Sequence, residues 1–306
     1  MTGDGIRQKY VDDRNWAEYN ERLVRRGELY LDLDFLRNWD REVSKMNRDK
    51  RGRPYEYPET FVRFMAFVHI LFYLPYRQME GFLRKLSKFV GELKAADYTT
   101  LFKRIAELEL QIDDIPPSEP VIIALDSSGV KVTNRGEWMR ERWKRCRGRI
   151  KVHIAVDVKR RQVLALEVTN EHTGDSKKFK DLVEKAEDNL GKDKIKRVLA
   201  DGGYDAKDNF NLLRQKGIES GIKTRENAST RARGSPYRAK CVRERRKLGY
   251  EKWKERYGYG QRWAAEGILS AVKRIMGESV RATSPDGMFR EVKMKFIFYN
   301  MLLSMT

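Results

Sequence analysis

Residues 121–125, VIIAL, form an uninterrupted apolar run in a chain in which 36% of the residues are charged. A short run of this kind is typical of a strand that is buried on both faces. The segment 150–159, IKVHIAVDVK, alternates strictly between apolar and other residues, which predicts a second strand with one covered face. Residues 162–170 follow after a short basic turn and complete a predicted hairpin. The chain therefore needs a sheet with helices packed against it.

Downstream of this hairpin, helical and extended patterns take turns. The sequence predicts helices near 176–190 and 207–216, and strands at 195–201 and 218–224. Strands followed by alternating helices and strands imply an α/β fold, in which helices cover a mixed sheet. We expect this α/β domain to span residues 119–306, after the Pro-rich boundary DDIPPSEP.

Residues 1–112 carry helical patterns only. Three helices are expected at about 59–73, 77–88 and 99–111, the last capped by Asp97 or Thr99. A compact helical trio with a basic third member is typical of a helix-turn-helix at about 77–111. In that arrangement four side chains would face DNA: Thr99, Thr100, Lys103 and Arg104. A plain helical bundle is the alternative, and the pattern leaves both open.

The charge balance points to a polyanionic partner. Lys and Arg total 64 against 45 Asp and Glu, which gives a net charge of +19 and a pI near 9.8. Nucleic acid is the usual partner of so basic a chain. The basic residues gather at 135–151 and in an insertion at about 223–258, where Trp and Tyr are interleaved with them. Such a mixture suits phosphate contact combined with base stacking.

Other classes of protein find little support. Cys146 and Cys241 lie far apart, and no Cys or His spacing resembles a zinc site. The apolar segment 64–76 is too short to span a bilayer, and the N-terminus has no apolar signal segment. We therefore expect a cytoplasmic protein with no membrane partner, associated with the nucleoid when it is bound to DNA.

One further segment, YGQRWAAEGILSAVK at 259–273, predicts an amphipathic helix. At about 100° per residue, four polar side chains fall within roughly 60° of one another: Tyr259, Arg262, Glu266 and Lys273. The opposite face is apolar and can pack on a core. A solvated face with ordinary charge pairs is the other interpretation of the polar stripe.

Three carboxylates stand out by position. Asp126 ends the apolar run of the first strand, Asp201 ends that of the fourth, and Glu266 lies on the amphipathic helix. Carboxyl ends of strands are where open α/β sheets place their ligands. Three carboxylates from separate elements can bind two Mg²⁺ ions. In a chain with 45 acidic residues such a triplet is weak evidence when taken alone.

Three other polar residues in the same region are weighed against this triplet. Asp157 is a possible rival to Asp126, although it lies in the alternating strand. Asp175 is expected to cap the helix near 176. His153 shares a strand face with Lys151 and Asp157 and could approach the metal ions, but the expected place for it is the surface of the sheet.

With these motifs in place, the chain resembles the DDE transposases of prokaryotic insertion sequences, of the insertion sequence 5 kind within the broader insertion sequence 4-like group. That family carries Tyr, two residues, Arg, three residues, Glu, six residues and Lys around its last catalytic carboxylate, and residues 259–273 match this spacing without a gap. LADGGYDA (199–206) and ALDSSGVKV (124–132) are similar to its two Asp motifs. GRPYEYPETFVRF and LPYRQMEGFLRKL are similar to its usual N-terminal region.

The resemblance implies a ribonuclease H-like core in which Asp126, Asp201 and Glu266 are catalytic and bind Mg²⁺ or Mn²⁺, as two ions. It also implies that Tyr259, Arg262 and Lys273 grip transposon-end DNA. The expected activity is metal-dependent cleavage at the ends of the element and 3′-OH strand transfer into target DNA. We expect double-stranded DNA as the partner and a homodimer in the DNA complex. A nuclease that does not join strands, and a non-catalytic DNA-binding protein derived from a transposase, are the alternatives.

Overall fold

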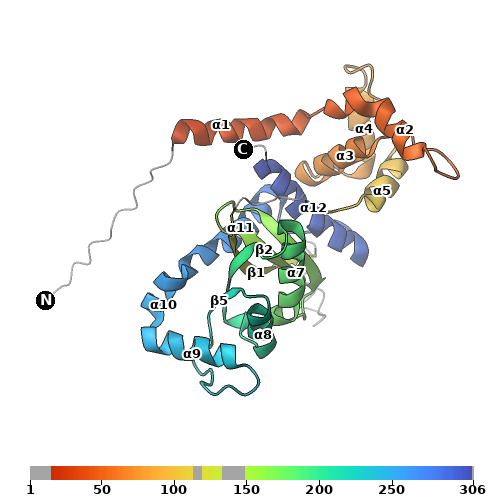
Figure 1. Ribbon diagram of the computed structural model, residues 1–306. Helices are drawn as coiled ribbons and strands as arrows, with labels where there is room; N and C mark the ends of the chain where they lie inside the picture. The colour runs from red at the N-terminus through yellow and green to blue at the C-terminus, as the bar shows by residue number, and fades with distance from the viewer. Residues whose placement is uncertain (1–14, 113–118, 133–148, 305–306) are drawn as a thin grey trace, which may run out of the picture.

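The computed structural model of the protein describes residues 15–112, 119–132 and 149–304. Short helices make up the N-terminal part, and a sheet with its covering helices makes up the rest (Figure 1). The N-terminal helices are α1 (Trp16–Glu28), α2 (Trp39–Asn47), α3 (Glu59–Leu71), α4 (Tyr76–Leu86) and α5 (Tyr98–Glu107). The predicted all-helical N-terminal region is confirmed.

In the part of the chain that the structure describes, five strands form one mixed sheet in the order β3-β2-β1-β4-β5. They are β1 (Val121–Lys131), β2 (Arg149–Asp157), β3 (Val163–Asn170), β4 (Ile195–Ala200) and β5 (Glu219–Ile222). β2 is antiparallel to both β1 and β3, whereas β4 runs parallel to β1 and β5 parallel to β4. The expected mixed sheet is confirmed.

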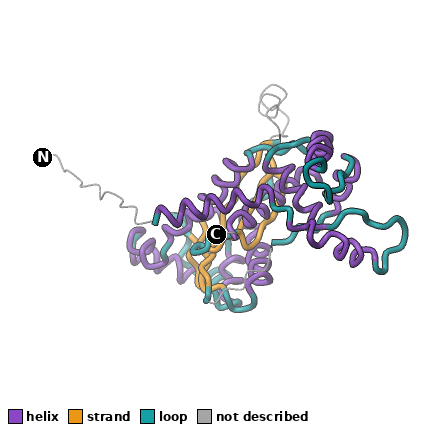
Figure 2. The backbone as a smooth tube through the Cα atoms, turned by 90° about the horizontal axis from the view of Figure 1, so that it is seen from above, coloured by secondary structure: helices purple, strands orange, loops and turns teal. Residues whose placement is uncertain are grey.

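The two faces of the sheet bury different clusters. Ile123 and Leu125 of β1 face one cluster, which α7 (Phe179–Leu190) and α8 (Lys207–Gln215) complete. Ala124 and Val130 face the other, to which α11 (Trp263–Met276) and α12 (Pro285–Ser304) contribute. The strands thus lie between layers of helices (Figure 2). Cover on both faces explains why β1 begins as a continuous apolar run.

The N-terminal helices share their core with the sheet. One hydrophobic cluster runs from Phe61 and Met65 of α3 through Phe298 of α12 to Val163 of β3. The ring of Phe67 meets that of Phe298 edge-on, with centroids 5.5 Å apart. α12 therefore joins the helical region to the sheet, and the domain boundary near residues 112–119 stays a prediction.

The basic insertion lies between β5 and α11. It contains α9 (Pro236–Leu248) and α10 (Tyr250–Tyr257), which reach out beside β5 (Figure 1). Gly258, in a left-handed conformation at φ 60°, ends α10. Among the described residues, no helix is both long enough and apolar enough to cross a membrane.

Candidate active site

The sheet brings two of the predicted carboxylates to the same place. In the parallel pair of β1 and β4, Ala124 lies opposite Leu199. Asp126 and Asp201 each follow two residues later, so both are carried past this pair on the same face of the sheet. Ala124 and Leu199 belong to the cluster that α11 covers. The two aspartates therefore lie on the α11 side of the sheet.

The third carboxylate, Glu266, comes from α11. The apolar face of this helix is buried against the sheet through Ala265, Ile268 and Leu269. Glu266 projects from the first turn, with 53% of its side chain exposed. The apolar back of α11 thus keeps Glu266 out of the core, on the side of the helix where it pairs with Arg262.

The helix is shorter than the sequence predicts. α11 begins at Trp263, and Tyr259–Arg262 form a separate 3-10 turn. The prediction of a single helix from residue 259 was therefore wrong. The physical reason is the left-handed Gly258, after which the chain enters a tighter turn before regular helix begins.

Arg262 links two of the carboxylates. One of its nitrogens, Nη1, lies 3.4 Å from Asp126 Oδ2, and the other, Nη2, pairs with Glu266 Oε1. Burial acts to lower the pKa of Arg262, but the charges of Tyr259, Asp126 and Glu266 outweigh it and raise that pKa. A guanidinium that stays charged is well suited to contact carboxylates or phosphate.

Asp126 has a raised pKa, which its surroundings explain. Burial raises its pKa, and the negative charges of Glu266 and Asp201 add to this rise, while the Ser127 N–H and Arg262 oppose it. Asp201 and Glu266 therefore both lie within electrostatic reach of Asp126. Acids with a perturbed pKa are common at functional sites, and at ion-pair networks as well.

The carboxylates are not gathered into a ready metal site. Among the described residues, no three or more His, Cys, Asp or Glu side chains are close enough together to hold a metal ion. Arg262 pairs with Asp126 and Glu266, so a protein cation balances these two acids. The chemistry of the donors still fits magnesium, which prefers hard oxygen ligands such as carboxylates.

Lys273 reaches the same strand from farther along α11. Its Nζ donates to Ser128 Oγ at 2.6 Å, two residues past Asp126 on the same face of β1. Burial lowers the pKa of Lys273, to which the nearby cations Arg149 and Lys131 contribute. Arg262 thus lies beside the carboxylates, and Lys273 lies farther along α11, at Ser128.

Tyr259 is placed differently from the other residues of its motif. Its ring is buried, with 7% of the residue exposed, and packs on Trp253 with centroids 5.0 Å apart. Arg262 Cζ lies 5.9 Å from the centroid of the Tyr259 ring. In this arrangement Tyr259 supports Arg262 from within an aromatic cluster.

Asp175 was missed as a candidate. Its Oδ1 accepts from Ser127 Oγ at 2.7 Å and lies 2.6 Å from Lys151 Nζ. Burial raises the pKa of Asp175, but bonds from His153, Lys151 and Ser127 outweigh it and hold the pKa well below its ordinary value. The prediction that Asp175 caps the following helix was wrong, because its carboxylate bonds to the strands instead of helix N–H groups. The sheet topology could have identified Asp175 as a candidate. β3 is parallel to β1, so the carboxyl end of β3, which precedes Asp175, lies at the same edge of the sheet as the carboxyl end of β1.

Asp175 also approaches Asp201. A Cβ atom on Gly203 would lie 2.9 Å from Asp201 Oδ1 and 3.4 Å from Asp175 Oδ2. Glycine at this position therefore lets two carboxylates converge over the backbone of one turn.

Two other candidates have structural roles. Asp157 lies at the far end of β2, where its Oδ1 accepts from the N–H groups of Lys159 and Arg160 and holds the turn to β3. His153 is fully buried, with Nε2 3.0 Å from Thr169 Oγ1 and Nδ1 3.4 Å from Asp175 Oδ1. The prediction that His153 lies on the surface of the sheet was wrong, because α7 and its preceding turn cover that face.

The N-terminal candidates lie on α5. Asp97 caps this helix, as predicted, and accepts from the N–H groups of Thr99 and Thr100. Lys103 is exposed, whereas the Arg104 guanidinium lies over the Tyr55 ring at 4.1 Å. The connection from α4 to α5 runs from Ser87 to Asp97, which is longer than the 3–4-residue turn of a helix-turn-helix. The DNA-binding role of this region stays a prediction.

The structure describes one of the two basic clusters in full. Residues 133–148, which hold most of the 135–151 cluster and Cys146, lie outside the described residues. The second cluster forms the insertion, where Lys240, Arg243 and Lys247 are exposed on α9.

Comparison with known proteins identifies related sequences. The sequence model of a family described as "Transposase DDE domain" matches residues 117–301. A second model with the same description matches residues 24–135. Between them, the two matches extend from the N-terminal helices to α12.

Solved structures show more distant likeness. The piggyBac transposase in a synaptic complex with hairpin DNA has a TM-score of 0.40 and 10% identity, over 92% of this chain and 75% of that chain. A simian T-cell lymphotropic virus intasome, in complex with PP2A regulatory subunit B56 gamma, has a TM-score of 0.32 and 12% identity, over 69% and 66%. At such TM-scores neither likeness bears on the site.

Proposed function

This chain belongs to the transposase DDE domain family, and on that premise we propose that it is the transposase of a prokaryotic insertion sequence. The Tyr-Arg-Glu-Lys spacing of residues 259–273 favours the insertion sequence 5 kind within the insertion sequence 4-like group. Its reaction is cleavage at the ends of the element, followed by joining of the freed 3′-OH to target DNA. Water is the nucleophile of the first step and the 3′-OH that of the second.

Asp126, Asp201 and Glu266 are the proposed catalytic residues. Support comes from the matched positions of the aspartates past the Ala124–Leu199 pair, and from Arg262, which pairs with both Asp126 and Glu266. The same carboxylates are the proposed ligands of Mg²⁺ or Mn²⁺, as two ions. When bound, such ions activate the attacking oxygen and stabilise the leaving oxygen of a phosphodiester.

Arg262 and Lys273 are the proposed contacts of the DNA backbone. Arg262 already contacts Asp126 and Glu266, so a phosphate held by this guanidinium would lie beside the carboxylates. Lys273, on Ser128, offers a second cation along the same helix. Tyr259 then acts through Arg262, because its ring is buried.

Double-stranded DNA is the proposed partner, in agreement with the net charge of +19. Joining two ends to one target needs two active sites, which favours a homodimer in the DNA complex. We further propose that α5, with Lys103 and Arg104, contributes to recognition of the ends, and that the protein acts at the nucleoid in the cytoplasm.

The convergence of Arg262 on Asp126 and Glu266 is the observation that carries this proposal. It is tested by incubating the protein and Mg²⁺ with a DNA fragment that bears the native ends of the element, plus a target plasmid. Cut ends joined to the plasmid are the expected products. Cut ends without joining would identify a nuclease, and binding without cutting would identify a non-catalytic DNA-binding protein.

A further inference from the structure

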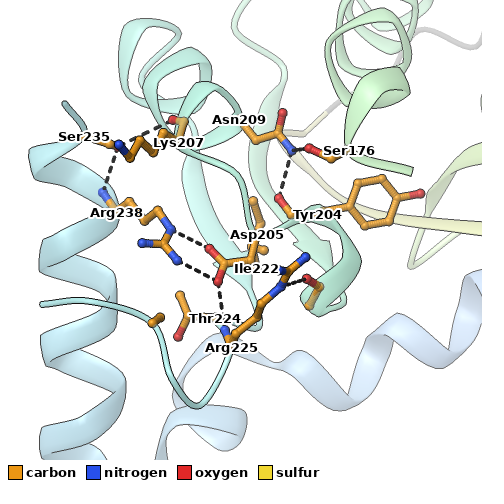
Figure 3. A network of polar contacts seen from close by, with 12 residues as sticks. Ser176, Tyr204, Asp205, Lys207, Asn209, Ile222, Thr224, Arg225, Ser235 and Arg238 are labelled. Carbon is orange, nitrogen blue, oxygen red and sulfur yellow. Dashed lines mark hydrogen bonds and ion pairs between the residues drawn. The ribbon is translucent and has the colours of Figure 1, made fainter. Parts of the chain in front are cut away.

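A buried carboxylate holds the turn that follows Asp201. Asp205 comes directly after the 3-10 turn Gly202–Tyr204, and no part of its side chain is exposed. Arg238 grips both oxygens, with Nε 2.6 Å from Oδ1 and Nη2 2.9 Å from Oδ2 (Figure 3). The backbone N–H of Arg225 donates to Oδ2 at 2.9 Å. A bidentate guanidinium and a backbone N–H together satisfy a carboxylate that is removed from water.

Arg238 belongs to the basic insertion. It lies in the first turn of α9, where its N–H donates to Ser235 Oγ at 3.4 Å. The same hydroxyl lies 3.5 Å from the carbonyl oxygen of Lys207, at the start of α8 (Figure 3). At the other end of the insertion, Arg197 of β4 donates to the Tyr257 carbonyl at 2.9 Å. The insertion is therefore anchored at both ends to the body that carries the sheet.

The turn held by Asp205 also orients Asp201. Asp201 Oδ1 accepts from the Gly203 N–H at 2.8 Å, inside this turn. Arg225 Nε donates to the Gly202 carbonyl at 3.3 Å, and Asn209 Nδ2 to the Tyr204 carbonyl at 2.8 Å (Figure 3). The turn that fixes Asp201 is thus bonded directly to Arg225 and Asn209, and only three residues separate Asp205 from Asp201.

We propose that Arg238, acting through Asp205, is a positioning residue for Asp201, so that the basic insertion sets the orientation of this carboxylate. The inference rests on the proposed function of Asp201. Neither Arg238 nor Asp205 touches the reacting atoms. Their role is to hold Asp201 within the small tolerance that a reacting geometry allows.

A matched pair of variants tests this coupling. Arg238→Gln and Arg256→Gln each remove one positive charge from the insertion, but Arg256 pairs with Glu244 at 3.2 Å and is 61% exposed. In the full chain, hydrogen exchange without DNA should show faster exchange of the amides of residues 202–206 in Arg238→Gln only. Both variants should bind end DNA with similar affinity. Cleavage of bound DNA should slow on the order of tenfold to a hundredfold in Arg238→Gln alone.

Arg238→Lys keeps the positive charge but loses the bidentate contact with Asp205. It replaces Arg238→Gln as the test variant if Arg238→Gln does not fold. It should show the same two effects in smaller measure. Faster exchange confined to α9, with residues 202–206 unchanged, would overturn the proposal, as would equal cleavage rates for the two Gln variants. Hydrogen exchange is measured without DNA, so it tests this coupling even if the protein never cleaves DNA. Absence of cleavage by the wild type would refute the proposed function alone.

Discussion

At the scale of single residues, the site is a balance of acids and bases at the edge of a sheet. Asp126 and Asp201 are carried there by neighbouring parallel strands, and Glu266 by a helix packed on them. Arg262 contacts two of these acids, while Lys273 rests on Ser128. In the proposed function, these cations contact the phosphate backbone of DNA and the three acids bind divalent ions.

The carboxylates should be individually indispensable. Asp126→Asn, Asp201→Asn and Glu266→Gln keep size and shape but remove a negative oxygen ligand, so each should abolish cleavage in Mg²⁺ and leave end binding largely intact. Cleavage assays, with melting curves to check the fold, measure this. Near wild-type cleavage by any one variant would remove that residue from the proposed set.

Loss of the Lys273 side chain should weaken the contact with DNA and leave metal binding unchanged. Lys273→Ala removes one charge-assisted contact, which is worth about 1.5–3 kcal/mol, or roughly ten- to a hundredfold in end binding or cleavage. Its neighbour Arg274 is exposed, so Arg274→Ala is the matched control on the same helix. Arg262→Ala should be at least as severe as Lys273→Ala, since a guanidinium can hold phosphate with two bonds. If the Lys273 and Arg274 variants behave alike, α11 presents an ordinary solvated face.

At the scale of elements, the regular parts of the fold were predictable and the turns were not. The apolar run of β1 and the alternation of β2 identify strands directly, because side-chain period reports burial. The 3-10 turn at Tyr259 escaped prediction, since helical spacing over one turn is nearly the same for both helix types. Asp175 escaped because its partners Ser127 and Lys151 are distant in sequence and meet only in the folded sheet.

Replacement of Gly258, which precedes this 3-10 turn, should lower the stability of the protein more than replacement of Gly260 within it. Gly258 has φ 60°, and a Cβ there would lie 3.3 Å from Gln261 Oε1. Gly258→Ala should therefore cost about 1–2 kcal/mol of unfolding free energy. Gly260→Ala is the control in the same turn, because its Cβ would meet only Lys254 Cε at 3.7 Å. Thermal unfolding of the two variants measures the difference, and equal melting temperatures would show that the turn adapts without strain.

At the scale of the whole molecule, one hydrophobic cluster joins two kinds of architecture. α12 packs on both the N-terminal helices and the sheet, so the two regions are held together by buried apolar contacts. The basic insertion extends beside β5 (Figure 1) and joins the other hydrophobic cluster through Cys241 of α9. The sequence indicated the basic character of this segment, but its attachment through Asp205 and Arg238 depends on contacts that no local pattern encodes.

The exposed cations of the insertion should contribute to salt-dependent DNA binding. Each neutralised phosphate contributes about −0.9 to the slope of log affinity against log salt. Lys240→Gln with Lys247→Gln on α9 should therefore make the slope shallower by nearly two. Lys180→Gln with Lys185→Gln, on α7, removes the same charge elsewhere and should leave the slope unchanged. A slope near zero for the wild type would contradict phosphate contact altogether.

Joining of ends that are already cut tests the proposed transposase activity most directly. Fragments with the native ends, prepared with either a 3′-OH or a 3′-deoxy terminus, are incubated with the protein, Mg²⁺ and a target plasmid. The account predicts that only the 3′-OH fragment is joined to the plasmid, and that Asp126→Asn joins neither. Absence of joining by the wild type, or undiminished joining by Asp126→Asn, would contradict it.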